Sequence, residues 1–294
     1  MISIIVSSRK PDVLSAFIAN VNETIGVPFE IIPIENSKGA LGICRAYNQG
    51  ASNARYDILC FSHEDVEFET RNWGRNVMKH LSNERIGLIG VAGGDTKGWV
   101  PSSWSSSIFP SEVSLIQHHG VGQPPERIVR TGYPGSTAVA RPVACVDGVW
   151  MCTRKDVFNK VRFDEATFPG FHAYDIDYSL QVSAHYEVCV VFDIMLCHFS
   201  PGSFNTEWLL NAIRLSDKWS HKLPHSVRTL ERRDLVNQHW TSMRIFIKKL
   251  RDLGFGKLYT MKQLLKYSNT KYFHLKHFLH FCKMVMTYDP QRTD

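Results

Sequence analysis

The 294-residue chain lacks the paired cysteines that a disulfide framework would require. It has seven cysteines, an odd number, and contains no CxxC pair. Most of them lie inside apolar runs such as EVCVVF and DILCF. We therefore expect reduced thiols in the core of a cytosolic protein.

Long apolar runs and common phosphate-binding loops are also absent. No stretch approaches the ~20 consecutive apolar residues of a membrane span, and MISIIV is too short and wrongly flanked for a signal peptide. GxGxxG and GxxxxGK[ST] do not occur, which argues against the usual dinucleotide and P-loop sites. Hydrophobic content of 44% and charged content of 21% are those of an ordinary globular protein.

Positive charge is concentrated in the last quarter of the chain. Residues 221–294 hold 15 Lys and Arg against 5 Asp and Glu, a net charge of +10, whereas residues 1–220 have a net charge of −4. A basic end of this kind often meets an anionic surface.

Strand and helix patterns alternate through the first third. Strand patterns occupy residues 2–8, 29–36, 56–62 and 86–93, and helix patterns occupy 12–22, 41–54 and 72–83. Asp12, after Pro11, is the expected cap of the first helix. This alternation predicts an α/β fold, with a mixed, mostly parallel Rossmann-like sheet flanked by helices.

The remainder divides into three parts. Residues 94–142 are rich in Gly, Pro, Ser and Trp and predict a long irregular, lid-like loop. Strand patterns then return at 143–153 and 187–200, and a basic helical pattern begins at 205. We expect a catalytic domain over 1–204, with a nucleotide-binding half at about 1–93 and an acceptor half at about 94–204, and a helical extension over 205–294.

Three clusters carry residue types suited to chemistry. HED (63–65) follows an apolar strand, and Asp65 there is either a metal ligand or part of a solvated turn. Asp175 and Asp177 lie among aromatic residues in FPGFHAYDIDYSL, where one is either a general base or a helix cap. His198 ends a strand and is either a structural residue or a ligand for Mn²⁺ or Mg²⁺.

Polar residues also end the first two predicted strands. Ser7, Ser8 and Arg9 end one strand, and Glu35 and Asn36 end the other. Short polar groups at neighbouring strand ends are suited to reading a base and ribose.

Together these segments resemble a family 2 glycosyltransferase of the GT-A fold, in the branch with an HxD-type motif. The resemblance covers roughly residues 1–205 and rests on the order and spacing of these segments: ISIIVSSR, IIPIENS, AYNQGASNARYDILCFSHEDVEF, VDGVWMCTRKDVF, FDEATFPGFHAYDIDYSLQV and CHFSPGS.

The resemblance implies roles for individual residues. HED falls where such enzymes carry Asp-x-Asp, so Asp65 matches the metal-binding acid, and His198 matches the histidine that completes the metal site. Asp175 matches the catalytic base of a Glu-Asp pair in which Tyr174 replaces the glutamate.

Further residues are implied in donor and acceptor binding. Ser8, Arg9, Glu35, His63 and Glu64 match donor-binding positions, and His63 replaces the first acid of the motif, which leaves open whether it contacts metal or donor. On the acceptor side the resemblance implies Asp147, Trp150 and Asp177, with a structural role for Asp177 as the alternative.

The implied activity is an inverting, metal-dependent transfer of sugar from a nucleotide-sugar, expected to be UDP-linked. The acceptor would be a glycan or a lipid-linked molecule in surface polysaccharide or glycoconjugate synthesis. A catalytically silent GT-A scaffold that binds glycan or a partner enzyme is the alternative, since His63 and Tyr174 depart from the pattern. A nucleotidyltransferase is disfavoured because SSRKPDVL lacks glycine.

The basic segment 243–286 has two interpretations. Its helices either pack on the catalytic domain with solvated basic faces, or lie on anionic lipid at the inner face of the membrane. Nucleic acid is not expected as a partner, since no recognised binding motif accompanies the charge.

Overall fold

The computed structural model describes residues 1–105, 108–119, 123–133, 135, 137–200 and 202–287. The predictions for 94–142, for CHFSPGS and for the tail therefore include positions outside the described residues, namely 106–107, 120–122, 134, 136, 201 and 288–294.

The described residues form alternating strands and helices up to β5, then mainly strands, then mainly helices. The strands are β1 (Ile2–Ser8), β2 (Phe29–Glu35), β3 (Ile58–Ser62), β4 (Val66–Phe68), β5 (Ile86–Gly90), β6 (Ala92–Gly94), β7 (Thr96–Lys97), β8 (Ser111–Gln117), β9 (Glu126–Arg130), β10 (Ala140–Pro142), β11 (Cys145–Val146), β12 (Trp150–Arg154), β13 (Glu187–Val191), β14 (Leu196–His198) and β15 (His225–Ser226). The helices are α1 (Pro11–Thr24), α2 (Ile43–Asn53), α3 (Trp73–Leu81), α4 (Lys155–Lys160), α5 (Tyr174–Val182), α6 (Thr206–Lys218), α7 (Arg232–Asp252), α8 (Lys257–Ser268) and α9 (Leu275–Met286).

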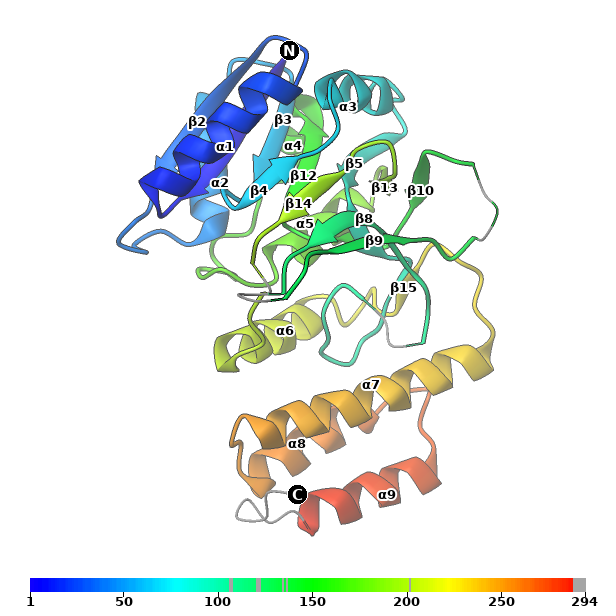
Figure 1. Cartoon of the computed structure of the whole chain (residues 1–294). Helices are drawn as coiled ribbons and strands as arrows, with labels where there is room; N and C mark the ends of the chain where they lie inside the picture. Colours follow the sequence, from blue (N-terminus) through cyan, green and yellow to red (C-terminus); the bar gives the residue numbers. More distant parts are fainter. Residues whose placement is uncertain (106–107, 120–122, 134, 136, 201, 288–294) are drawn as a thin grey trace.

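A seven-stranded sheet in the order β10-β13-β5-β12-β3-β1-β2 forms the centre of the fold (Figure 1). β1 runs parallel to β2 and β3, and β13 runs parallel to β5, whereas β12 and β10 are antiparallel to their neighbours. The predicted mixed, mostly parallel α/β sheet flanked by helices is confirmed. The sequence did not predict that β12 would insert between β3 and β5.

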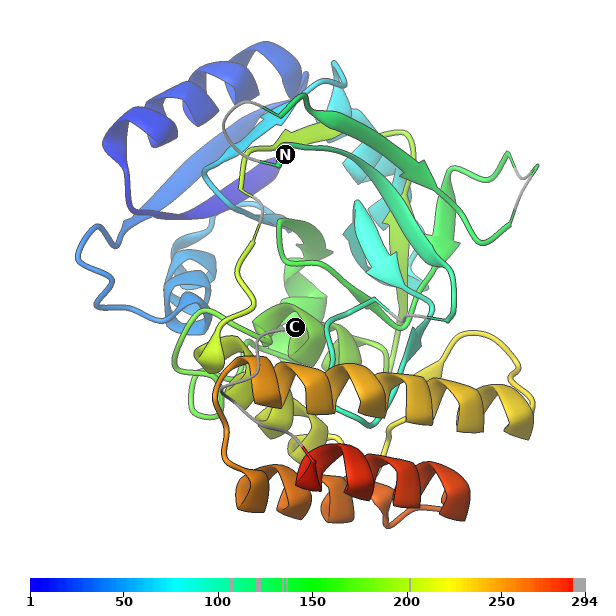
Figure 2. The same cartoon turned by 60° about the horizontal axis from the view of Figure 1, so that its bottom comes forward.

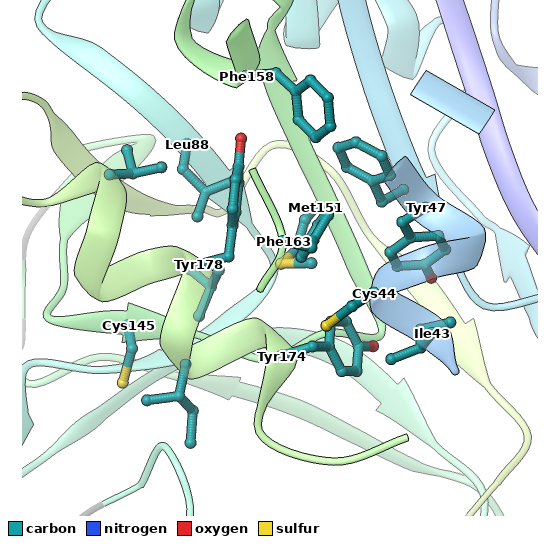
Figure 3. Close-up of a cluster of buried hydrophobic side chains, with 14 of the residues drawn as sticks. Ile43, Cys44, Tyr47, Leu88, Cys145, Met151, Phe158, Phe163, Tyr174 and Tyr178 are labelled. Atoms are coloured by element: carbon teal, nitrogen blue, oxygen red, sulfur yellow. The ribbon is translucent and has the colours of Figure 1, made fainter. Parts of the chain in front are cut away.

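Helices cover both faces of this sheet, because its strands are apolar on both sides. On β1, Ile2, Ile4 and Val6 pack in one core with α1 and α3, whereas Ile5 packs in a second core with α2, α4 and α5. Figure 3 shows part of the second core, where aromatic side chains fill the space between α2 and α5.

The prediction of one irregular loop over 94–142 is wrong. A second sheet has the strand order β11-β6-β8-β14-β4, with β9 beside β8. Two of its strands, β8 and β9, come from this region. Two more strands of the region pair elsewhere, β7 with β15 and β10 with β13. β8 is a seven-residue strand, SEVSLIQ, whose first five residues are buried. Burial against neighbouring strands determines this structure, and composition alone does not reveal it.

Local boundaries also differ from prediction. Lys10 precedes α1 as its N-cap, so Asp12 lies in the first turn and does not cap the helix. The expected strands 86–93, 143–153 and 187–200 are each interrupted, because their residues pass from the first sheet to the second or turn between them.

The C-terminal helices have a core of their own. Side chains of α6, α7, α8 and α9 pack together with Val100, and in Figures 1 and 2 α7, α8 and α9 lie as a group beside the sheet region. α6 joins both parts, since Leu215 belongs to the core beneath the first sheet and Leu209 to the C-terminal core. The predicted division at residue 204 therefore stays a prediction. Among the described residues no helix is long and apolar enough to span a bilayer.

Trp150, the first residue of β12 and a predicted acceptor-binding residue, lies in the core of the fold. Its side chain is fully buried, and its ring contacts Phe68 and Trp73 edge-on at centroid distances of 6.2 Å and 6.1 Å. The pleat of the sheet turns it toward the layer formed by α1, α3 and the second sheet.

We expect Trp150→Ala to lower the free energy of unfolding by about 3–5 kcal/mol, because it leaves a cavity among packed rings. Urea denaturation followed by circular dichroism measures this. Val129→Ala, at a 60% exposed position on β9, is the control and should change stability little. A loss for Trp150→Ala no larger than that of the control would contradict the packing described above.

Candidate functional site

The turn between β3 and β4 carries His63, Glu64 and Asp65 at the carboxyl end of a buried strand. The turn is fixed at one end by a hydrogen bond from the backbone N–H of His63 to the carbonyl of Val149 (3.0 Å). It is fixed at the other by pairing of β4 with β14, which places His198 opposite Val66. This register brings two sequence-distant segments together at one sheet edge.

Three side chains converge there. Asp65 Oδ1 lies 3.8 Å from His63 Nδ1 and 3.8 Å from His198 Nε2. One nitrogen or oxygen atom from each side chain lies within 4.8 Å of the others. Mixed imidazole and carboxylate ligands suit a transition-metal cation such as Mn²⁺.

The hydrogen bonds of His198 leave one nitrogen available for a cation. Gln117 Nε2 donates to the carbonyls of His118 and Ser200, each at 2.8 Å, which orients its amide oxygen toward His198. His198 Nδ1 is 3.1 Å from that oxygen and must carry the proton. In the neutral tautomer Nε2 then holds the lone pair, and it is buried without a hydrogen-bond partner among the described residues. These residues therefore fit a divalent cation.

A large pocket opens beside this cluster. Its volume is about 810 Å³, and its walls include Arg9, Asn36, Phe171, Gly202 and Glu207 as well as His63, Asp65 and His198. Ligand pockets commonly measure about 300–1,000 Å³, so this one has room for a nucleotide-sugar. Ser7 and Asn36, two of the polar residues at the ends of β1 and β2, also line it.

The other predicted donor residues divide into two groups. Arg9 and Glu64 line the pocket, whereas Ser8 and Glu35 do not. Both oxygens of Glu64 are used within the protein, since they accept hydrogen bonds from Ser8 Oγ (2.8 Å) and from the backbone N–H groups of Arg9 (3.0 Å) and Lys10 (3.1 Å). Glu64 and Ser8 therefore hold the β1–α1 turn in place. Glu35 is exposed and accepts from the backbone N–H of Ser37.

Asp175 lies in the first turn of α5, held by the backbone. Its Oδ2 accepts a hydrogen bond from the N–H of Gly148 (3.0 Å). Burial, followed by repulsion from Asp147, raises the pKa of Asp175 to about 7. A carboxylate with such a pKa is suited to accept a proton near neutral pH.

Asp147, a predicted acceptor residue, lies beside this base. It accepts hydrogen bonds from Trp104 Nε1 (2.5 Å) and from the N–H of Val149 (2.8 Å). Ala173, immediately before α5, has a left-handed backbone with φ of 69°, which costs an alanine about 1 kcal/mol. Such strain is retained where surrounding contacts fix the chain, here just before Tyr174 and Asp175.

The base and the ligand cluster are joined by hydrogen bonds. Tyr174 Oη lies 2.9 Å from His63 Nε2 and 3.0 Å from the carbonyl oxygen of Gly148, whose N–H holds Asp175. Asp175 is therefore linked to His63 through Gly148 and Tyr174, whereas Asp65 and His198 line the large pocket and Asp175 is not among its lining residues. Sequence reasoning missed Tyr174, Gly148 and Gln117 as parts of the site, because a tyrosine and a glycine carry no charge and Gln117 lies in the region predicted to be irregular.

Asp177, the third predicted acceptor residue, is structural. It is 1% exposed, and its carboxylate pairs with Lys218 (2.6 Å) and accepts hydrogen bonds from Trp219 Nε1 (2.7 Å) and Gln181 Nε2 (2.9 Å). Residues two apart on a helix point to different sides, so Asp177 faces α6 while Asp175 faces Gly148. These contacts within the protein support the structural alternative for Asp177.

Comparison with known proteins gives one family match. Residues 3–221, well over half of the chain, match the model of a family described as glycosyltransferase like. No curated protein sequence matches the chain.

Solved structures share the fold at low sequence identity. The crystal structure of GalNAc-T7 with UDP, GalNAc and Mn²⁺ aligns with a TM-score of 0.54 and 12% identity, over 98% of this chain and 57% of that one. The crystal structure of S. aureus TarS aligns with a TM-score of 0.48 and 12% identity, over 100% of this chain and 93% of that one. The likeness to GalNAc-T7 shows the GT-A fold. This chain spans a little over half the length of the GalNAc-T7 chain.

We expect Asp177→Asn to lower the free energy of unfolding by about 1–3 kcal/mol, because it removes the buried charge that holds Lys218 and Trp219. Thermal or urea unfolding measures the loss. Asp156→Asn is a matched control, because Asp156 is 58% exposed and its pair with Arg154 should contribute little. Equal stability of the two variants would contradict a structural role for Asp177.

Proposed function

Because this chain belongs to the glycosyltransferase-like family and has the GT-A fold, we propose that it transfers a sugar from a UDP-linked donor to a hydroxyl group of an acceptor, with inversion and with a divalent cation. The acceptor we propose is a glycan or a lipid-linked molecule of surface polysaccharide or glycoconjugate synthesis. The UDP and Mn²⁺ in the GalNAc-T7 structure support the choice of donor and metal.

One observation carries this proposal. Asp65 and His198 present a carboxylate oxygen and an unprotonated, buried imidazole nitrogen to the same point on the wall of the large pocket. An orphaned buried nitrogen costs free energy unless a ligand uses it. A cation bound there would neutralise the charge that gathers on the leaving nucleoside diphosphate.

Residues of this chain would bind the donor and remove the proton from the acceptor hydroxyl. Arg9 and Asn36, which follow β1 and β2 and line the pocket, would contact the nucleoside. Asp175 would take the proton from the acceptor hydroxyl at a carboxylate oxygen, while the N–H of Gly148 fixes that carboxylate. The acceptor oxygen would attack the anomeric carbon from the face opposite the diphosphate, which gives inversion.

The C-terminal helices are the proposed membrane contact, at the inner face of the membrane. Leu275, Leu279 and Met286 on α9 are each more than half exposed, and their spacing puts them on one side of the helix. Residues 253–287 contain six lysines and no acid. Exposed apolar side chains beside lysines favour an anionic bilayer, where a lipid-linked acceptor would be held.

The enzymatic proposal is tested without an acceptor. The full chain is incubated with a panel of nucleotide-sugars and Mn²⁺, and we expect slow UDP release from one donor. Because Asp175 is the proposed base, Asp175→Asn should lower turnover by about 10²–10⁴-fold while UDP binding, measured by calorimetry, is retained. In the wild type the rate should rise with pH through about 7, as the raised pKa of Asp175 is passed and the carboxyl loses its proton.

Asp156→Asn serves again as the control, since Asp156 is an exposed acid outside the pocket. Unchanged turnover in Asp175→Asn, or no hydrolysis of any common donor, would favour the silent scaffold over the enzyme.

The membrane proposal predicts binding to vesicles that contain anionic lipid, measured by sedimentation and weakened by salt. The double change Leu275→Glu and Leu279→Glu should abolish binding, because it places charge on the apolar side of α9. Val129→Glu, at a similarly exposed position on β9, is the control. Equal sedimentation of both variants and the wild type would rule out α9 as the contact.

A further inference from the structure

We propose that Tyr174 is a positioning residue that makes His63 a third ligand of the divalent cation and joins that ligand to the catalytic base. The inference rests on the proposed metal-dependent function and extends it. The resemblance leaves open whether His63 contacts metal or donor, and it places a glutamate where this chain has Tyr174.

The hydrogen bonds of Tyr174 fix the tautomer of His63. The phenol has one proton, and the carbonyl oxygen of Gly148, 3.0 Å away, can only accept it. The bond between Tyr174 Oη and His63 Nε2 (2.9 Å) must then be donated by the imidazole. His63 therefore carries its proton on Nε2, and Nδ1 holds a lone pair.

The lone pair on Nδ1 faces the other two ligands. Nδ1 lies 3.8 Å from Asp65 Oδ1, which is too long for a hydrogen bond. The same separation holds between Asp65 Oδ1 and His198 Nε2. Atoms bound to one cation at about 2.1 Å each lie about 3–4 Å from one another. Asp65 Oδ1 is thus spaced from each imidazole nitrogen as one ligand of a common centre is from another, and one ligand atom from each of the three residues lies within 4.8 Å of the others.

Packing holds Tyr174 where this role requires it. The side chain is 4% exposed, and its ring meets that of Tyr47 edge-on at a centroid distance of 5.8 Å and that of Phe163 at 6.1 Å. Figure 3 shows Tyr174 and Tyr47 together in the core between α5 and α2. The hydroxyl therefore has little freedom to leave His63.

Gly148 joins this ligand to the base. Its carbonyl accepts from Tyr174, and its N–H donates to Asp175 Oδ2. A Cβ atom at this position would lie 2.1 Å from Tyr174 Oη, so only glycine allows the tyrosine to approach. One residue thus positions the proton acceptor and, through Tyr174, the imidazole of the metal site.

The test measures Mn²⁺ binding to the full chain by calorimetry and electron paramagnetic resonance, with no sugar present. Tyr174→Phe keeps the ring and removes the hydroxyl, so we expect about 10–100-fold weaker Mn²⁺ binding. Tyr178→Phe is the matched control. Tyr178 is a buried tyrosine of the same helix that takes no part in the hydrogen bonds to His63 and Gly148, so Mn²⁺ affinity should not change.

A double-mutant cycle separates positioning from general damage. If Tyr174 acts through His63, adding Tyr174→Phe to His63→Ala should cause no further loss of Mn²⁺ affinity. Gly148→Ala is a second variant, which should weaken Mn²⁺ binding because its Cβ displaces Tyr174. Additive losses in the cycle, or unchanged Mn²⁺ affinity in Tyr174→Phe, would overturn the inference.

Asp65→Asn distinguishes this failure from failure of the proposed function. If Asp65→Asn abolishes Mn²⁺ binding while Tyr174→Phe leaves it unchanged, the metal site stands and the role of Tyr174 falls. If the wild type binds no Mn²⁺, the metal-dependent function and the inference fall together.

Discussion

The pairing of β4 with β14 is the constraint on which the candidate site depends. Strand β4 begins directly after Asp65, and β14 ends at His198, so their antiparallel register sets the two side chains next to each other. β8 lies on the other side of β14 and supplies Gln117. The strands β4, β14 and β8 of the second sheet thus determine the geometry of the cluster.

The first half of the central sheet could be predicted because its signals are local. Apolar runs of five to seven residues alternate with amphipathic helices. Each of these strands and helices can be recognised from its own residues, without knowledge of the segments that it packs against. The second sheet could not be predicted in this way. β4, β6 and β14 have three residues each, and their conformation depends on partners far away in the chain.

In the candidate site, residue type was predictable and side-chain direction was not. Asp65 and His198 follow or end buried strands, and the sheet edge brings such positions together. Trp150 and Asp177 stand next to the site in sequence but point into the interior, because the pleat of β12 and the turn of α5 set their direction. The sequence marked Tyr174 only as the residue that replaces a glutamate, and its hydrogen bonds to His63 and Gly148 became apparent only in the structure.

The amide of Gln117 links His198, a residue of the candidate metal site, to the wall of the large pocket. Its oxygen meets the His198 ring, and its nitrogen holds the carbonyl of Ser200, a residue in the wall of the large pocket. Because a planar amide moves as a unit, a ligand that displaced the Ser200 backbone together with this amide would also change the hydrogen bond that orients the imidazole. Contact of a ligand with Ser200 in the pocket wall and the orientation of the His198 ring would therefore be coupled through Gln117.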